Sequence, residues 1–324
     1  IRTPRVLFHA AYNLGACRVD EDDRRSAEDM LSDANAALQA VERRADTRCL
    51  IHDSAIRDEE QQVLRIEEKL REAIDTGERG LTIHLQPQVA MAASGEASSI
   101  VGAEALVRWN DPELGAMSPG RFIPIAEQSG LIVELGRWVI EQALDLLADW
   151  RDDPKLGRIR LAINAAAAEL YSEDYADRVI GGLDHRGVEA GQLEVEITER
   201  VLADSTAMSR ADNLKRLCHA GVRLAVDDFG TGYSSLAYLA DMPINLIKID
   251  KQFVDPLPPD ADTRVLAPVI VNLAHELQLE CLAEGVETAE QAAYLREIGC
   301  RYAQGYHYAR AVPRGDFERM VRED

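Results

Sequence analysis

The feature that most constrains this chain is a regular alternation of short β-rich runs and helical stretches from Leu81 to the C-terminus. The runs are rich in Val, Ile and Leu, and the stretches between most of them carry apolar residues at helical spacing. Strands are predicted at Leu81–Pro87, Val101–Trp109, Ile159–Ala165, Leu193–Glu199, Val222–Asp228, Leu246–Asp250, Glu280–Glu284 and Tyr302–Tyr306. The clearest helices are predicted at Glu134–Trp150, Thr206–Ala220, Arg264–Leu277 and Ala289–Ile298.

Eight such strands within about 250 residues are typical of a (β/α)8 barrel. We therefore predict an α/β fold with a barrel at residues 81–324. Gly221 and Gly299 directly follow two of the predicted helices, as expected of C-terminal caps. The alternative is an open doubly wound sheet, which is less favoured because no Gly-x-Gly-x-x-Gly segment follows the first predicted strand.

Residues 1–54 carry a smaller α/β pattern. A strand is predicted within Tyr12–Val19 and another within Arg48–His52, and between them Ser26 is placed to cap the start of a helix. The apolar face of that helix consists of Ala27, Met30, Leu31, Ala34, Leu38 and Val41. The segment is too short for a complete domain. Because the chain begins without an initiator Met, we expect it to be a piece of a longer protein.

A connector helix is predicted over residues 55–80, ending near Gly77 and Gly80. Its apolar residues are Ile56, Val63, Ile66, Leu70, Ala73 and Ile74, and charged residues fill the gaps between them. Two interpretations stay open. The helix packs against its own domains, or it pairs with a second copy of itself as a signalling helix.

The composition excludes several kinds of partner. The chain has 36 Lys and Arg residues against 57 Asp and Glu, a net charge of −21, which disfavours binding to a DNA or RNA polymer or to an anionic membrane surface. No run approaches the ~20 apolar residues of a membrane span, and no signal peptide opens the chain. The five cysteines are widely spaced without a Cys-x-x-Cys, which indicates reduced core thiols rather than a disulfide or zinc framework.

The predicted strand ends carry an unusual set of polar side chains. In a barrel these ends meet at one mouth, where active sites lie. The residues are Glu104 with Arg108, Asn164, Glu196, Glu199, Asp227, Asp228, Lys248, Asp250, Glu284, Glu287 and Gln304. So many carboxylates would repel one another without a compensating cation. Ligands that offer only oxygen favour Mg²⁺ or Mn²⁺ over zinc.

Asp227 and Asp228 are adjacent at a strand end that leads into the Gly-rich stretch Phe229–Gly232. Neighbouring residues on a strand point to opposite faces, but at such a turn both carboxylates can face one mouth. One carboxylate is then expected to bridge two metals and the other to reach a metal-bound water, as in phosphoester hydrolysis. Lys248 is expected to orient that water or to stabilise charge on the phosphate. An ordinary salt bridge from Lys248 to Asp227 or Glu284 is the alternative.

The motifs around these residues resemble, in order and spacing, those of the EAL family of cyclic di-GMP phosphodiesterases. They are Gln86-Pro87, Glu104–Trp109, Phe122–Pro124 with Ala126-Glu127, Asp227–Leu236, Lys248–Asp250, Ala283–Thr288 and Gln304–Tyr306. The Asp227–Leu236 motif matches over ten consecutive positions. The resemblance implies a TIM-like barrel with one strand reversed. It also implies hydrolysis of cyclic di-GMP to linear 5′-pGpG with two Mg²⁺ or Mn²⁺ ions per site, and inhibition by Ca²⁺.

The resemblance also implies roles for individual residues. Metal ligands are implied at Glu104, Asn164, Glu196, Asp227, Asp228 and Glu284. Lys248 resembles the residue that contacts the catalytic water, and Glu104, Asp228 and Glu284 join it as catalytic residues. Substrate contacts are implied for Arg108, which would grip a phosphate, and for Gln86, Leu106, Gln304 and Glu287. Glu199 resembles the glutamate that anchors the Asp228–Leu236 loop, which in this family bears on metal binding and dimerisation.

A few positions depart from the family pattern. Ala166 stands where a Ser is usual, His84 stands near a usual Tyr, and Tyr306–Ala311 lacks the commoner Phe and Pro. None of these changes removes an implied ligand. Residues 1–54 resemble the end of a GGDEF domain, although an unrelated α/β cap is the alternative. The GGDEF signature does not occur in the chain, so no cyclase activity is assigned to it.

The resemblance further implies cyclic di-GMP as the ligand, a homodimer, and upstream sensor domains outside this chain. It places the protein in the bacterial cytoplasm, with any membrane anchor of a full-length protein also outside this chain. Two other functions stay open. One is a receptor that binds cyclic di-GMP without hydrolysing it and signals through the connector helix. The other is a different Mg²⁺-dependent barrel enzyme that stabilises an enolate, which explains the carboxylates and Lys248 but not the ten-residue match.

Overall fold

The computed structural model describes residues 12–19, 24–42, 47–77, 80–91, 98–199, 201, 208–231, 242–259 and 265–324. The contacts within the chain divide it into two compact units, residues 1–71 and 72–324. The division falls inside helix α2 (Ser54–Thr76), so most of the predicted connector belongs to the N-terminal unit.

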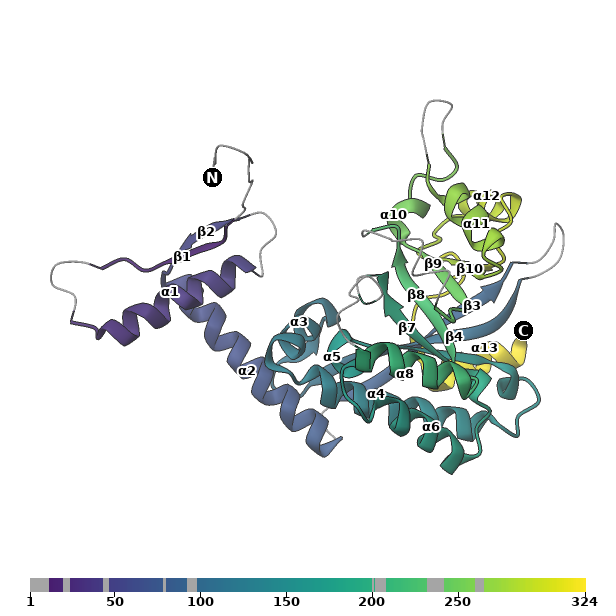
Figure 1. Ribbon diagram of the computed structural model, residues 1–324, viewed down its shortest axis with the longest axis horizontal. Coiled ribbons are helices and arrows are strands. Elements are labelled where there is room, and N and C mark those ends of the chain that lie inside the picture. The colour runs from purple at the N-terminus through teal and green to yellow at the C-terminus, as the bar shows by residue number, and fades with distance from the viewer. Residues whose placement is uncertain are drawn as a thin grey trace. The chain divides into compact units, whose positions relative to one another are not determined.

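The N-terminal unit is a β–α–β arrangement followed by α2 (Figure 1). Strands β1 (Leu14–Ala16) and β2 (Cys49–Ile51) pair in parallel, and helix α1 (Ala27–Glu42) connects them. Both predicted strands and the helix are therefore confirmed.

Two local interactions fix this unit. The Ser26 hydroxyl accepts a hydrogen bond from the Asp29 backbone N–H at 3.1 Å, which confirms Ser26 as the N-cap of α1. Gly15 in β1 lies so close to α1 that a Cβ there would stand 2.2 Å from the Leu38 nitrogen, and only glycine allows this approach. The buried core consists of Ala36, Ala37, Ala40 and Ile56 with Leu50 packed against it.

The second unit is a closed barrel (Figure 1), and it confirms all of the predicted strands. Its strands are β3 (Leu81–Ala90), β4 (Ser99–Asp111), β6 (Arg160–Asn164), β7 (Leu193–Thr198), β8 (Arg223–Phe229), β9 (Leu246–Ile249), β10 (Glu280–Ala283) and β11 (Tyr302–Ala303). Strand β3 runs antiparallel to both of its barrel neighbours, β4 and β11, whereas the other barrel pairs are parallel. The reversed strand implied by the family resemblance is thus confirmed. Short strands β5 (Gly115–Met117) and β12 (Val312–Pro313) extend the sheet beside β4 and β3.

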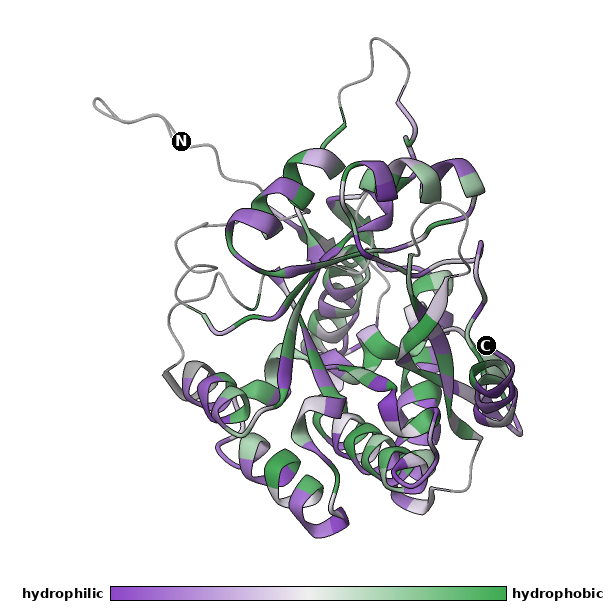
Figure 2. Ribbon diagram, turned by 90° about the vertical axis from the view of Figure 1, so that its right-hand side faces the viewer, coloured by the Kyte–Doolittle hydropathy of each residue, from purple (hydrophilic) through white to green (hydrophobic). Residues whose placement is uncertain are grey.

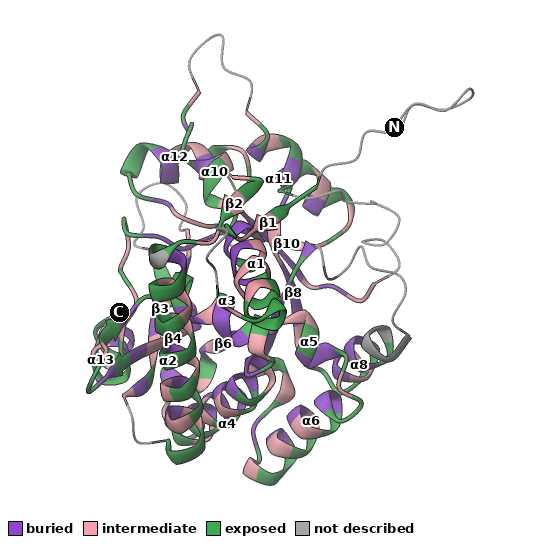
Figure 3. Ribbon diagram, turned by 90° about the vertical axis from the view of Figure 1, so that its left-hand side faces the viewer, coloured by how far each residue is buried: buried purple, intermediate pink, exposed green. Residues whose placement is uncertain are grey.

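Helices surround the barrel. They are α3 (Pro119–Ser129), α4 (Ile132–Trp150), α5 (Ala167–Leu170), α6 (Tyr175–Arg186), α8 (Met208–His219), α10 (Lys251–Val254), α11 (Ala267–Glu276), α12 (Ala289–Glu297) and α13 (Arg314–Glu323). Figure 2 shows hydrophobic and hydrophilic bands alternating along these helices, and Figure 3 shows their buried faces alternating with exposed ones. Gly221 and Gly299 have φ values of 93° and 91°, the left-handed conformation expected of helix caps.

The barrel interior is unusually polar. Most buried apolar strand residues belong to one core that also contains the surrounding helices. A separate small cluster of Ala225, Leu246 and Leu282, with Tyr302 packed against it, comes from strands β8, β9, β10 and β11. Since strand side chains alternate between faces, this cluster lies inside the barrel, between a charged layer at each end.

The charged layer at the N-terminal ends of the strands is an ion-pair network. Glu280 on β10 accepts from Arg160 on β6 at 2.9 Å and also pairs with Arg223 on β8. Arg223 reaches Glu194 at 3.0 Å, and the Tyr302 hydroxyl reaches Glu280 at 3.3 Å. Strands β6 and β10 are not neighbours, so these contacts cross the lumen.

Within the described ranges, none of the helices combines the length and the apolar character that a membrane crossing requires.

Candidate active site

The charged layer at the C-terminal ends of the strands is centred on Lys248. This lysine lies on β9 with a fully buried side chain. Its ammonium Nζ lies 2.6 Å from Glu196 Oε2, 2.7 Å from Glu284 Oε1, 3.2 Å from Asp227 Oδ1 and 3.7 Å from Glu104 Oε2. Lys248 therefore forms the salt bridges to Asp227 and Glu284 that were the alternative to a catalytic role. The same contacts place its ammonium in the middle of the predicted metal ligands.

Glu104 is held by two amide side chains. Asn164 Nδ2 donates to Glu104 Oε1 at 2.8 Å, and Gln304 Nε2 donates to Oε2 at 2.6 Å. These residues come from β6 and from the segment after β11, so three parts of the barrel fix one carboxylate. The Gln304 Oε1 atom is buried and has no hydrogen-bond partner among the described residues.

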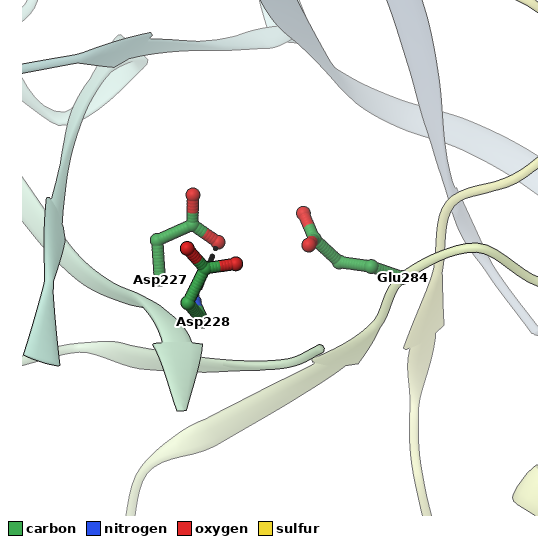
Figure 4. A group of neighbouring side chains, drawn as sticks. All are labelled: Asp227, Asp228 and Glu284. Atoms are coloured by element: carbon green, nitrogen blue, oxygen red, sulfur yellow. Dashed lines mark hydrogen bonds between the residues drawn. The ribbon is translucent and has the colours of Figure 1, made fainter. Parts of the chain in front are cut away.

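Asp227 and Asp228 both face the mouth, as predicted. Asp228 has a φ of 53°, a left-handed conformation that is uncommon outside glycine, and the β8–β9 register shifts between Val226 and Phe229. This local distortion overrides the strand alternation that would point Asp228 away. Figure 4 shows Asp227 and Asp228 side by side with Glu284, directly after β10, facing them, and ligand atoms of the three lie within 4.8 Å of one another.

The site holds more negative charge than Lys248 can balance. Burial raises the pKa of Glu284 to about 8, with Asp227 and Glu104 adding to the rise despite the nearby Lys248. Burial and the charges of Asp227 and Asp250 raise the pKa of Asp228 to about 6. The pKa of Glu196 is raised well above its usual range, mainly by burial. Burial opposes the charged form of Lys248, but the surrounding carboxylates raise its pKa well above the ordinary value.

These residues fit a hard divalent cation. The buried Glu196 Oε1 has no hydrogen-bond partner in the described part of the chain, and Asp227, Asp228 and Glu284 converge beside it. Carboxylate oxygens are the ligands that Mg²⁺ and Mn²⁺ prefer, and no histidine or cysteine is in the group. A bound cation would offset the repulsion that raises these pKa values.

A cavity of about 320 Å³ opens over this layer. It is lined by Gln86, Glu104, Leu106, Asp227, Lys251, Glu284, Gly285, Glu287, Gln304, Gly305 and Tyr306. Gln86, Leu106, Gln304 and Glu287, all predicted to contact substrate, are thus brought together. Gln86 Nε2 also donates to the Ala309 carbonyl at 3.3 Å, and Glu287 accepts from Lys251 at 2.8 Å.

Among the lining residues that were not predicted as site residues, two carry large side chains, Lys251 and Tyr306. Each lies next to a motif that was recognised: Lys251 follows Lys248–Asp250, and Tyr306 ends Gln304–Tyr306. A cation directly after a strand end was the signal that could have identified Lys251. Its place in the cavity depends on Gly285, where a Cβ would stand 2.4 Å from Lys251 Cγ.

Arg108 lies at the edge of a neighbouring cavity. It is four residues after Glu104 on β4, on the same face of the strand. Its Nη1 donates to the Val107 carbonyl at 2.9 Å, and it lines a mainly apolar cavity of about 290 Å³ that also contains Leu106 and Asn164. Leu106 lines both cavities, so they adjoin.

Glu199 follows β7 and is buried. The Gly230 backbone N–H donates to Glu199 Oε2 at 3.0 Å, so the glutamate contacts the start of the loop that it was predicted to anchor. Positions 232–236 of that loop, including Ser234 and Leu236, lie outside the described residues.

Residues 67–311 match the EAL domain family. The chain is 35% identical over 295 residues to the bifunctional diguanylate cyclase/cyclic di-GMP phosphodiesterase MucR of Pseudomonas aeruginosa, covering 90% of this chain and 41% of MucR. It is 36% identical over 303 residues to the cyclic di-GMP phosphodiesterase NbdA of the same organism, covering 93% of this chain and 37% of NbdA. The chain therefore spans well under half the length of these curated relatives.

Solved structures show the same likeness. The structure of the PaMucR phosphodiesterase in complex with c-di-GMP superposes with a TM-score of 0.71 at 36% identity, covering 78% of this chain and 99% of that one. The EAL domain of Mycobacterium smegmatis DcpA superposes with a TM-score of 0.63 at 30% identity, covering 75% of this chain and 98% of that one.

Proposed function

Because the chain belongs to the EAL domain family, we propose that it is a metal-dependent phosphodiesterase that hydrolyses cyclic di-GMP to linear 5′-pGpG. The observation that carries the proposal is the layer around Lys248, where Glu104, Glu196, Asp227 and Glu284 surround one buried ammonium at the floor of an open cavity. The names of MucR and NbdA support the choice of substrate.

The reaction adds water to one phosphodiester and breaks the bond between phosphorus and the 3′ oxygen, so the ring opens to a 5′-phosphorylated dinucleotide. Divalent cations, which we propose to be two Mg²⁺ or Mn²⁺ ions, would offset the phosphate charge and make the attacking water more acidic. Glu104, Asn164, Glu196, Asp227, Asp228 and Glu284 would hold them.

The residues of the chain position the reacting groups. Lys248 carries three N–H donors at the centre of the layer, and it would orient the attacking water and stabilise charge on the phosphate. Asn164 and Gln304 fix the Glu104 carboxylate, so its direction does not depend on the substrate. Arg108 would bind a phosphate through its guanidinium, and Gln86, Leu106, Gln304 and Glu287 would line the path of the dinucleotide.

The receptor alternative is less well supported. A protein that only binds the dinucleotide has no need of a complete set of metal-binding carboxylates, and every implied ligand is present around Lys248, Asp228 and Asn164.

The test is an assay of purified protein with cyclic di-GMP. With Mg²⁺ or Mn²⁺ we expect linear pGpG to accumulate, detected by ion-exchange chromatography, and with Ca²⁺ we expect no turnover. Glu104→Ala should lower kcat by orders of magnitude. Binding of cyclic di-GMP without any pGpG in either metal would refute hydrolysis and leave the receptor function.

A further inference from the structure

Glu169 is a buried acid that lies beside the metal-binding layer and is not one of its proposed ligands. It belongs to α5, five residues after Asn164, and lines the same cavity as Asn164 and Arg108. Only 4% of its surface is exposed, and burial raises its pKa to about 7 although the nearby Arg178 favours the ionised form. Burying an acid is unfavourable unless its oxygens make specific contacts.

One oxygen of Glu169 fixes the chain directly after Asn164. The Ala166 N–H donates to Glu169 Oε2 at 2.8 Å, and the Ala165 N–H donates to the Glu196 carbonyl at 2.9 Å. Ala166 is the N-cap of α5, and a bond back to it from the third helical residue is one half of a capping box. The other half needs a hydroxyl at the N-cap, which alanine lacks. The bond from Glu169 therefore holds this turn without that support.

The other oxygen of Glu169 occupies space that a glycine provides. Gly136 lies inside α4, and a Cβ there would stand 1.8 Å from Glu169 Oε1 and 2.2 Å from its Cδ. Glycine is less favourable than alanine inside a helix. The missing side chain of Gly136 thus leaves room for the carboxyl group of Glu169, which lies between α4 and the turn before α5.

The turn that Glu169 fixes sets the direction of Asn164. Asn164 Nδ2 donates to Glu104 Oε1 at 2.8 Å, yet Asn164 is an exposed residue, so close packing does not confine its side chain. Its direction depends on the backbone that follows, which is the backbone tied down at Ala165 and Ala166. A rotation of this turn would move the Asn164 amide away from Glu104.

We propose that Glu169 is a positioning residue that directs Asn164 toward Glu104 and the metal cations, with Gly136 providing the space for its carboxyl group. The inference rests on the proposed function and adds to it a residue that contacts neither metal nor substrate. Side chains that orient metal ligands commonly contribute about 10- to 100-fold to metal affinity or activity.

The first experiment compares Glu169→Ala with Glu169→Gln. We expect Glu169→Ala to raise the Kd for Mn²⁺ about tenfold, measured without substrate from the electron paramagnetic resonance signal of free Mn²⁺. It should also lower kcat about tenfold while the KM for cyclic di-GMP stays within about threefold. Glu169→Gln keeps an oxygen that accepts from the Ala166 N–H, so its constants should stay within about threefold of the wild type.

The second experiment displaces the carboxyl group without removing it. We expect Gly136→Ala to weaken Mn²⁺ binding about as much as Glu169→Ala, because the new methyl group would occupy the place of Glu169 Oε1. Gly181→Ala on α6 is the matched control, since a Cβ there meets nothing within 4 Å, and it should leave the Kd unchanged. The double variant Gly136→Ala/Glu169→Ala should bind Mn²⁺ no more weakly than Glu169→Ala alone, because the clash is then absent.

Thermal melts separate positioning from a purely structural role. A structural role would lower the melting temperature of Glu169→Ala and Gly136→Ala and leave the Mn²⁺ Kd of the folded protein unchanged, which would overturn the proposal. A loss in Glu169→Gln as large as in Glu169→Ala, or additive losses in the double variant, would also overturn it. A wild-type protein that binds Mn²⁺ but does not hydrolyse cyclic di-GMP would contradict the proposed function, whereas the role of Glu169 would still be decided by Mn²⁺ binding.

Discussion

Lys248 shows how one residue organises the site. Its ammonium is fully buried and forms ion pairs with Glu196, Glu284, Asp227 and Glu104. Among the described residues, no other cation pairs with all four of these carboxylates. A lone buried ammonium would be costly, and so would the carboxylates without it. The lysine and the acids therefore require each other, and the remaining negative charge requires a metal cation.

Replacing Lys248 with Met should affect both chemistry and stability. We expect kcat to fall by at least a hundredfold, because the donor that orients water is lost. Without metal, the variant should also be destabilised by about 3–5 kcal/mol, since the buried acids lose the cationic partner at their centre. Adding Mg²⁺ should restore much of that stability. Thermal melts with and without Mg²⁺ test this, with the exposed Lys215→Met as the matched control. Near-normal hydrolysis by Lys248→Met would contradict the role.

The raised carboxyl pKa values predict a pH effect on the metal-free protein. Burial raises the pKa of Asp228 from 3.8 to about 6 and the pKa of Glu284 from 4.5 to about 8 in the folded chain. The folded state therefore binds more protons than the unfolded state between these limits, so stability should fall as the pH rises from about 4.5 to 8.

Saturating Mg²⁺ should remove this trend, because the cation stabilises the ionised carboxylates. The measurement is the midpoint of urea unfolding at several pH values, with chelator and with Mg²⁺. If the urea midpoint of the metal-free protein rises over the same pH range, these carboxyl groups are not destabilised by burial and mutual repulsion in the folded state.

At the scale of the elements, the barrel strands separate two charged layers. The C-terminal ends carry the layer around Lys248, and the N-terminal ends carry the network around Glu280. Between them, on strands β8, β9 and β10, lies the small apolar cluster of Ala225, Leu246 and Leu282. One layer serves the site, and the other closes the opposite end of the barrel.

Glu280→Gln should therefore lower stability without changing the chemistry. The change leaves Arg160 and Arg223 without their shared anionic partner inside the lumen, at a cost of about 1–3 kcal/mol. KM and kcat should stay within about twofold, because the apolar layer separates the network from Lys248. Denaturant unfolding and steady-state kinetics test this, and exposed Glu276→Gln is the control. A large fall in kcat at unchanged stability would mean that the two layers are coupled.

At the scale of the whole molecule, exposed apolar residues gather in the N-terminal unit. Among the described residues, the large exposed hydrophobic side chains of that unit are Tyr12, Leu14, Val19, Leu31, Ile51 and Leu64. Leu64 lies on α2, the helix for which self-pairing was one interpretation, and it is 64% exposed. Such a surface is typical of a region that contacts another chain or domain.

We expect the chain to form a dimer that depends on α2. Leu64→Glu should increase the monomer fraction, because it replaces an exposed apolar side chain of the helix with a charge, whereas Gln61→Glu on the same helix should leave the dimer intact. Light scattering at micromolar concentration measures both. A wild-type protein that is monomeric throughout that range would refute the dimer, and dimers unaffected by Leu64→Glu would place the interface elsewhere.

The barrel, its strands and the set of polar residues at the strand ends could all be predicted from the sequence alone. Hydrophobic periodicity depends on neighbours within a few residues, so it survives in a linear chain, and the ordered motifs identified the reversed β3 through the family resemblance. Ser26 as the cap of α1 was predictable for the same reason, because the contact spans three residues.

The interactions among these residues, in contrast, depend on how the closed barrel brings distant parts of the chain together. Lys248 meets Glu104 across the lumen from non-adjacent strands, and the left-handed turn at Asp228 brings its carboxylate toward Glu284. Closing the barrel also created the charge imbalance that raises the carboxyl pKa values, and it brought Gly305 against Val286 at the cavity wall. These properties depend on distances between residues far apart in the chain, which local sequence patterns do not specify.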